Sequence, residues 1–215
     1  ILSAGELFVN TDFADFLERV SSEGAASFYL GEVAELIAKI FGDSGLLDEK
    51  ALSQYHVAVR KPVMTTFMET QVYSNPAPST GGTLIIFLLR LLEEGKIQNL
   101  KDSDIVRAMA VTNTARKEVC TDPNQEYQIN QLLEKKIFNG YLKKLLSEYM
   151  DSNDNLTIPG RGETTHVSVI DKDMNCASVT TTNGEGCGYI LPGTGIMLNN
   201  MLGEEDLNPL GFHKW

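Results

Sequence analysis

The sequence predicts an α+β protein in which helical patterns fill the first part and strand patterns follow a polar linker. Apolar residues recur at helical spacing along much of the chain up to residue 119. The run 151–162 is polar and carries Gly and Pro, and alternating apolar and polar residues begin soon after it. With 215 residues, the chain is long enough to bury a sizeable core.

The N-terminal region is expected to form three helices. Asn10 or Thr11 can cap the first, and Gly24 follows its end. The second ends at Gly42, and Asp48 caps a short third helix. The apolar positions that define them are Phe13, Phe16, Leu17 and Val20, then Val33, Leu36, Ile37 and Ile40, and finally Leu52.

Two strands and three further helices are expected before the linker. The strands cover 63–67 and 71–74, and the prolines at 76–78 cannot continue a strand interior. Ser79-Thr80-Gly81-Gly82 then opens an apolar helix. This turn could bind an anion at the helix N-terminus, or it could serve only as a cap and a tight turn. The three helices are expected over 83–94, 102–119 and 140–150.

A β-hairpin is expected directly after the linker. Apolar and polar residues alternate on both sides of the polar turn 171–175. Because antiparallel partners face each other, the returning strand should bring Thr182 and Asn183 close to Thr164.

The net charge of −11 argues against unspecific binding to nucleic acid or anionic membranes. There is no apolar run of about 18 residues, so no membrane span is predicted. The first residues do not resemble a signal peptide, and we expect a soluble protein, cytoplasmic if no signal peptide precedes residue 1. The cysteines and histidines lack metal-type spacing, so neither a metal site nor a cofactor is predicted. We expect free thiols, with a Cys176–Cys187 bridge left open.

Thr164 is the residue that most clearly suggests a catalytic role. If the Glu163–Thr164 bond were cut, Thr164 would carry its hydroxyl and a free α-amine on one residue. A threonine hydroxyl is a poor nucleophile without an adjacent base, and an N-terminal amine can be that base. The reference pKa of an α-amine, about 7.7–8.0, leaves a useful fraction neutral near pH 7.

Four ordered motifs carry a resemblance to a known family. Residues 164–175, beginning Thr-Thr-His-Val-Ser-Val, resemble the start of the small subunit of γ-glutamyltranspeptidases, and 193–200 resemble a Gly-Thr-Gly…Leu-Asn-Asn segment that follows it. Upstream, 28–31 and 76–82 resemble motifs of the large subunit.

The resemblance implies the four-layer αββα sandwich of N-terminal-nucleophile hydrolases. Residues 1–163 would be the C-terminal part of the large-subunit region, ending in a linker at about 151–163. Residues 164–215 would be the N-terminal part of the small-subunit region, and both would form one domain. The precursor would cut itself at Glu163–Thr164. Thr164 would then form a γ-glutamyl-enzyme from glutathione or another γ-glutamyl compound, resolved by water or an amino acid.

Three further residues receive roles from their motif positions. Thr182 would hydrogen-bond the nucleophile, although it could be an ordinary strand residue. Asn183 would bind the α-amino and carboxylate groups of the glutamyl donor. Glu204 stands where the family usually has an aspartate that pairs with the substrate ammonium, although it could belong to a solvated acidic loop.

Two departures from the family pattern touch amino-acid recognition. Gly184 stands where the better-known enzymes have an asparagine, and Met201 follows Asn199-Asn200 where a polar residue is common. They leave open a non-catalytic relative that acts as a binding or sensing scaffold. Segments expected to supply the oxyanion hole are not recognisable, so the remaining large- and small-subunit segments should complete the site. Homo-oligomerisation is left open.

Overall fold

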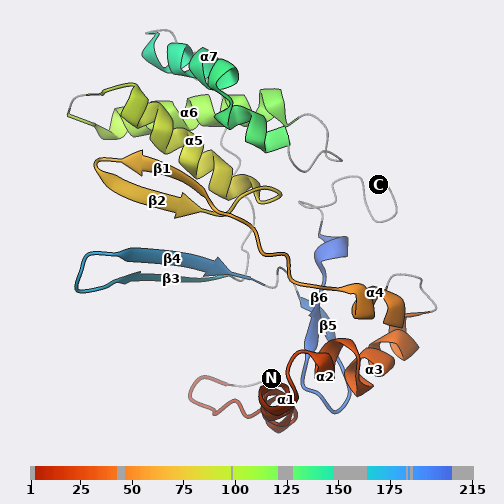
Figure 1. Cartoon of the computed structure of the whole chain (residues 1–215). Coiled ribbons are helices and arrows are strands. Elements are labelled where there is room, and N and C mark those ends of the chain that lie inside the picture. Colours follow the sequence, from red (N-terminus) through yellow and green to blue (C-terminus); the bar gives the residue numbers. More distant parts are fainter. Residues whose placement is uncertain are drawn as a thin grey trace. The chain divides into compact units, whose positions relative to one another are not determined.

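The computed structural model describes residues 3–42, 47–97, 99–120, 128–147, 164–182, 184 and 186–204 (Figure 1). The chain divides into two compact units. Unit 1 combines Ile1–Val57 with Thr157–Trp215, and unit 2 is Ala58–Leu156. Both helices and strands are present, as the α+β prediction requires.

Unit 2 combines a β-hairpin with a group of helices, of which α5 packs on the hairpin. Strands β1 and β2 are antiparallel, with Val63 opposite Ser74 and Phe67 opposite Thr70. Helix α5 packs against this hairpin and against the other helices of the unit. Its elements are β1 (Val63–Phe67), β2 (Thr70–Ser74), α5 (Thr80–Glu94), α6 (Asp102–Val119), the 3-10 helix η2 (Gln128–Leu133) and α7 (Lys135–Leu146).

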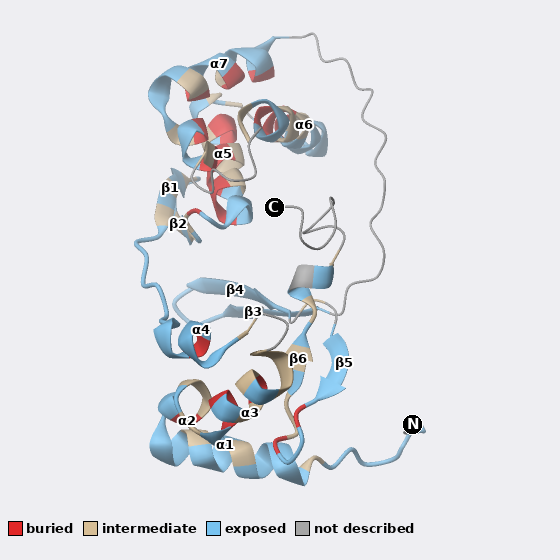
Figure 2. Ribbon diagram, turned by 90° about the vertical axis from the view of Figure 1, so that its right-hand side faces the viewer, coloured by how far each residue is buried: buried red, intermediate tan, exposed pale blue. Residues whose placement is uncertain are grey.

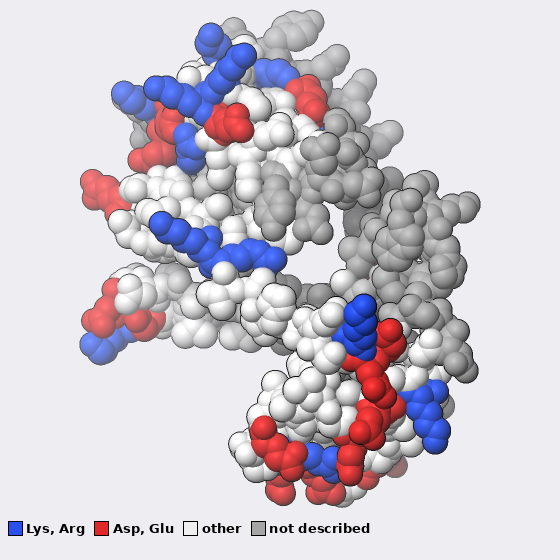
Figure 3. Space-filling view, turned by 45° about the vertical axis from the view of Figure 1, so that its right-hand side comes forward, with Lys and Arg blue, Asp and Glu red and all other residues white. Residues whose placement is uncertain are grey.

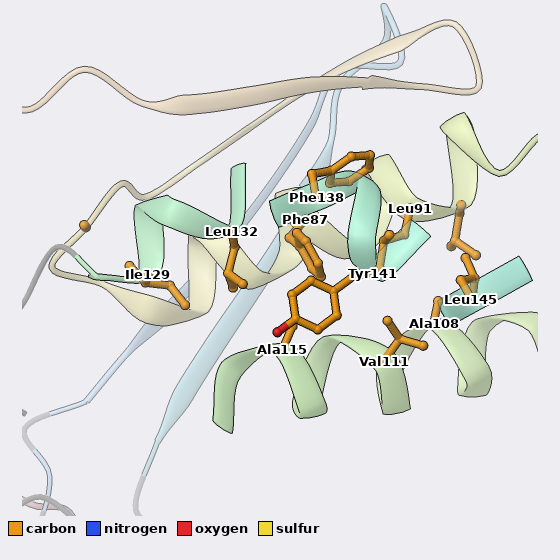
Figure 4. Packing of buried hydrophobic residues seen from close by; sticks show 12 residues of the cluster. Phe87, Leu91, Ala108, Val111, Ala115, Ile129, Leu132, Phe138, Tyr141 and Leu145 are labelled. Carbon is orange, nitrogen blue, oxygen red and sulfur yellow. The ribbon is translucent and has the colours of Figure 1, made fainter. Parts of the chain in front are cut away.

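The core of unit 2 is built around aromatic side chains from α5 and α7 (Figure 4). The Phe87 ring meets the rings of Phe138 and Tyr141 edge-on, at centroid distances of 5.6 and 5.8 Å. Such edge-to-face pairs stabilise beyond the apolar area that they bury. The Arg90 guanidinium lies 4.1 Å from the centroid of the Phe138 ring and closes the cluster on one side.

Helix α5 begins at Thr80, so the glycines predicted as a turn belong to its first turn. The backbone of Gly82 lies directly against that of Asn75, because a Cβ on Gly82 would come within 2.7 Å of Asn75 N. Since real Cβ atoms do not approach so closely, only glycine lets α5 start beside the end of β2. This close packing gives Gly82 a structural role there, whereas a Cβ built on Gly81 would meet nothing within 4 Å.

The predicted start of the last helix was wrong. Helix α7 begins at Lys135, and Gly140 lies inside it. Phe138, Tyr141 and Leu145 are all buried on one face. Their burial outweighs the cost of a helical glycine, about 1 kcal/mol relative to alanine. The helix was predicted to reach Met150, but its last residue is Leu146 and the backbone of Ser147 is extended; 148–150 lie outside the described residues.

Unit 1 begins with the helices that the sequence predicted, plus a short one that it missed. Asn10 caps α1 by accepting a hydrogen bond from Phe13 N at 3.1 Å, and Asp48 caps α4 by accepting one from Ala51 N at 2.7 Å. The helices are α1 (Thr11–Glu23), α2 (Ala26–Tyr29), α3 (Glu32–Phe41) and α4 (Glu49–Gln54), and α2 was not predicted. Their shared core consists of Val33, Ala34, Ile37, Leu52 and Leu191.

The second part of unit 1 contains two separate antiparallel strand pairs. The predicted hairpin is confirmed as β3 (Thr165–Ile170) and β4 (Cys176–Thr181). A second, unpredicted pair is β5 (Gly186–Ile190) with β6 (Met197–Asn199), followed by the 3-10 helix η3 (Met201–Gly203). The turn of this second pair is tied to α1, since Asn10 Nδ2 donates to Gly195 O at 3.3 Å. Unit 1 therefore contains parts of both predicted segments, 1–163 and 164–215, whose union in one domain remains a prediction.

Candidate functional site

The β3–β4 hairpin carries a ladder of polar side chains on one face. His166 Nδ1 lies 2.8 Å from Thr180 Oγ1, and His166 Nε2 lies 2.9 Å from Ser168 Oγ and 3.0 Å from Ser178 Oγ. Ser168 Oγ and Ser178 Oγ are 3.1 Å apart. Because side chains alternate between the faces of a strand, the intervening valines lie on the opposite face. The hairpin thus has one hydrogen-bonded polar face and one apolar face.

Thr164 and Thr182 lie at the open end of this hairpin. The register pairs Thr165 with Thr181, and one further step places Thr164 opposite Thr182. Both flank the paired strands and are exposed. Thr164 and His166 are two positions apart, as are Thr180 and Thr182, so the alternation puts all four on the polar face. The other half of the predicted cleavage bond, Glu163, and the predicted donor-binding Asn183 lie outside the described residues.

Just after β4, the side chain of Thr182 bonds to the backbone of Gly184 in a turn of the Ser/Thr type. Gly184 N donates a hydrogen bond to Thr182 Oγ1 at 3.0 Å, and Gly184 has a φ of +63°. This turn fixes Thr182 Oγ1 as an acceptor toward the backbone that follows it. The position of the threonine hydroxyl is therefore linked to the conformation at Gly184.

Glu204 approaches the same turn from the end of η3. A Cβ built on Gly184 would overlap Glu204 Oε1, and it would lie 2.8 Å from Cδ and 3.0 Å from Oε2. The Glu204 carboxylate therefore rests against the Cα of Gly184, and the residue is half-buried. The structure thus gathers three of the singled-out residues, Thr182, Gly184 and Glu204. The one sequence signal of this contact was the glycine itself.

The segment before Glu204 is held by the asparagine pair. Asn199 Oδ1 accepts a hydrogen bond from Met201 N at 3.1 Å, and Gly203 N donates to Asn200 O at 2.8 Å. These bonds shape η3 and set where the chain emerges at Glu204. The Asn-Asn motif therefore has a structural task in addition to any contact with a substrate.

The described pocket of unit 1 lies away from the predicted site residues, none of which lines it. It is enclosed by α1, α3 and the turn after β5, where Arg19 and Glu32 form an ion pair at 3.2 Å. Acidic side chains gather over this part of unit 1 (Figure 3). The lining residues are Asp12, Asp15, Phe16, Arg19, Glu32, Val33, Leu36, Pro192, Gly193 and Thr194.

Within the described ranges, no group of His, Cys, Asp and Glu side chains could hold a metal ion. None of the helices in that part of the chain has the length and apolar character needed to cross a membrane. The three cysteines, Cys120, Cys176 and Cys187, are free thiols. Burial raises the pKa of the Cys120 thiol, which keeps it protonated and unreactive near neutral pH.

Comparison with known proteins identifies the family. Residues 1–210 match the γ-glutamyltranspeptidase family. The glutathione hydrolase proenzyme of Escherichia coli (strain K12) is 30% identical over 227 residues, covering 97% of this chain and 38% of that protein. The capsule biosynthesis protein CapD proenzyme of Bacillus anthracis is 30% identical over 216 residues, covering 96% of this chain and 39% of that protein.

A solved structure shows the same fold. The γ-glutamyltranspeptidase from Pseudomonas nitroreducens, in complex with L-DON, matches with a TM-score of 0.56 at 22% identity, covering 70% of this chain and 48% of that one. This chain belongs to the γ-glutamyltranspeptidase family. It spans about two fifths of the length of the two proenzymes named above.

Proposed function

We propose that this chain is part of a self-processing γ-glutamyl transferase or hydrolase in which Thr164 is the nucleophile. The observation that carries the proposal is the hairpin register, which sets Thr164 opposite Thr182 at an exposed strand end. Membership of a family whose relatives are named as proenzymes supports the processing step.

Processing would begin with attack by the Thr164 hydroxyl on the carbonyl carbon of Glu163. The peptide C–N bond breaks as the C–O bond forms, so the Glu163 acyl group moves from the Thr164 nitrogen to its oxygen. Water then hydrolyses the ester. This frees the Glu163 carboxylate, the Thr164 hydroxyl and the Thr164 α-amine, and the amine becomes the base for later turnovers.

Turnover would use the same hydroxyl on a γ-glutamyl donor such as glutathione. The α-amine takes the hydroxyl proton as oxygen attacks the γ-carbonyl carbon, and the proton passes to the departing amine. The γ-glutamyl ester is then resolved by water or by the amine of an amino acid. The donor class rests on the name of the Escherichia coli relative, a glutathione hydrolase.

Three side chains would assist Thr164. Thr182 would hydrogen-bond the nucleophile, and Asn183 would bind the α-amino and carboxylate groups of the donor. Glu204 would pair with the ammonium of the donor. Glu204 is half-buried, which suits this role, because a partly desolvated ammonium needs a charged partner.

The proposal includes the four-layer αββα arrangement and further subunit segments that complete the site. Val167, Val169 and Val179 are 54%, 55% and 54% exposed on the apolar face of the hairpin. Apolar strand faces are stable when another layer covers them. We infer that the remaining large- and small-subunit segments cover this face and supply donors for the oxyanion.

A second candidate is a non-catalytic relative that serves as a binding or sensing scaffold. The observation in its favour is Gly184, which removes a side chain from the predicted donor site. A scaffold of this kind would keep the hairpin and would not need a free amine at Thr164.

Mass spectrometry and N-terminal sequencing of the full-length protein test the proposal. Wild type should yield two fragments, one of which begins at Thr164. Thr164→Ala should remain a single chain, and Thr165→Ala, which alters the neighbouring threonine of β3, should still be cut. Cleavage at another bond would exclude Thr164 as nucleophile. An intact wild-type chain without turnover would favour the scaffold.

A further inference from the structure

The contact between Gly184 and Glu204 depends on the absence of a side chain at position 184. A methyl group there would occupy the space of Glu204 Oε1 and crowd Cδ at 2.8 Å. Contacts below about 3 Å are not tolerated in packed protein, so the carboxylate would have to move. Glycine thus sets how close the carboxylate comes to the end of β4.

The need for glycine at position 184 comes from the limited space around it as well as from its backbone conformation. Gly184 and Gly188 share a left-handed backbone, with φ of +63° and +74°. Nothing lies within 4 Å of a Cβ built on Gly188, whereas a Cβ on Gly184 overlaps a carboxylate. A side chain at either position would meet the same backbone strain, but only at 184 would it also displace Glu204.

The same glycine is joined to Thr182. Its N–H donates to Thr182 Oγ1 at 3.0 Å, and its Cα lies against the Glu204 carboxylate. Gly184 therefore influences the positions of both the Thr182 hydroxyl and the Glu204 carboxylate. An alanine at this position keeps its N–H, so it would disturb the carboxylate while leaving the bond to Thr182 available.

We propose that Gly184 is a specificity-determining residue, which admits the Glu204 carboxylate to the place where it recognises the α-ammonium of a γ-glutamyl donor. This inference rests on the proposed function. It states that Gly184, which has no side chain, determines where the Glu204 carboxylate lies. The consequence is specific. A side chain at 184 weakens selection for the α-ammonium, and a shorter acid at 204 restores it.

The test uses the complete protein in four forms: wild type, Gly184→Ala, Gly184→Ala with Glu204→Asp, and Gly188→Ala. Each is measured for self-cleavage, for thermal unfolding, and for kcat and KM with γ-glutamyl-p-nitroanilide and its des-amino analogue. Gly184→Ala should still cut itself, and its preference for the α-amino donor should fall about tenfold, mainly through KM. The aspartate is one methylene shorter, so it should recover most of that loss. Gly188→Ala should stay within about twofold of wild type, as a change outside any site does.

Thermal unfolding separates this inference from the proposed function, because it does not require turnover. Because the displaced group is the end of a flexible side chain, Gly184→Ala should lower Tm only slightly more than Gly188→Ala, and Glu204→Asp should recover that small difference in the Gly184→Ala background. Equal Tm values for the two alanine variants, with no gain from the aspartate, would overturn the steric match. An unchanged donor preference in an active Gly184→Ala enzyme would overturn the role in specificity. Absence of cleavage and turnover in wild type would overturn the proposed function, and with it the role in specificity, while the Tm comparison still decides the steric match.

Discussion

The core of unit 2 and the β3–β4 hairpin of unit 1 are stabilised in opposite ways. The cluster in unit 2 contains 12 buried residues, most of them from α5, α6, η2 and α7. Every residue of β3 and β4 is exposed, which Figure 2 shows as uniformly pale strands. The hairpin is held by its backbone ladder and by the hydrogen bonds around His166.

This difference indicates that the two regions contribute to different properties, unit 2 to stability and the hairpin to the proposed chemistry. Unit 2 contributes apolar burial, which dominates the free energy of folding. The hairpin presents Thr164 and Thr182 at an exposed end, and reactive groups need such access. Substitutions in unit 2 should therefore change the free energy of unfolding, whereas substitutions at the open end of the hairpin should change reaction rates.

The largest expected effect is on the core of unit 2. Phe87→Ala removes the ring that meets Phe138 and Tyr141, and it should lower the free energy of unfolding by about 3–5 kcal/mol. Ile85→Ala, on the same helix but 52% exposed, should cost clearly less. Urea denaturation of the complete protein measures both. Similar losses for the two variants would mean that the cluster is not the main source of stability in this unit.

The next effect concerns the hairpin. Thr182→Val keeps the side-chain shape but removes the hydroxyl, and it should slow processing and turnover about tenfold, as the loss of a hydrogen bond worth about 1.4 kcal/mol would. Its unfolding midpoint should change little. Thr180→Val is the control, because its hydroxyl contacts His166 on the same face, one pair further from Thr164. Wild-type rates in Thr182→Val would make Thr182 an ordinary strand residue.

Local rules predicted the parts of the fold that local interactions determine. Asn10 and Asp48 were recognisable as caps because their side chains bond to backbone only three residues ahead. The β3–β4 hairpin was recognisable because period-two alternation brackets a polar turn. The position of Thr164 opposite Thr182 followed from the hairpin, so this part of the candidate site could be predicted from the sequence.

Tertiary contacts decided the rest. Gly140 looked like a helix start, yet burial of Phe138 and its neighbours extends α7 on both sides of it. Strands β5 and β6 are short, β5 carries Gly186 and Gly188, and Leu191, which follows β5, is buried in the same cluster as residues of α3. The approach of Glu204 to Gly184 links positions far apart in sequence, and no periodicity encodes it.

The smallest expected effect is the pH dependence of the stability that one polar contact contributes to unit 2. Tyr141 Oη donates to Glu118 Oε2 at 2.7 Å, and Lys144 Nζ lies 3.0 Å from the same oxygen. The hydrogen bond from Tyr141, and then that from Lys144, lowers the pKa of Glu118 below its ordinary value of 4.5. Burial, and then the bond to Glu118, raises the pKa of Tyr141 above its ordinary value of 10.0.

Both shifts define a pH window. A lowered carboxylate pKa stabilises the fold above pH 4.5, and that contribution is lost as pH falls through the folded pKa. A raised phenol pKa stabilises it below pH 10.0, and that contribution is lost as pH rises through the folded pKa. Tyr141→Phe should therefore cost about 1 kcal/mol at pH 7, a modest value because Glu118 is half exposed, and less at pH 3. Tyr73→Phe, which loses a bond to the neutral side chain of Gln71, should show no such dependence between these two pH values. If urea denaturation gives Tyr141→Phe the same cost at both pH values, the charge of Glu118 contributes nothing to this contact.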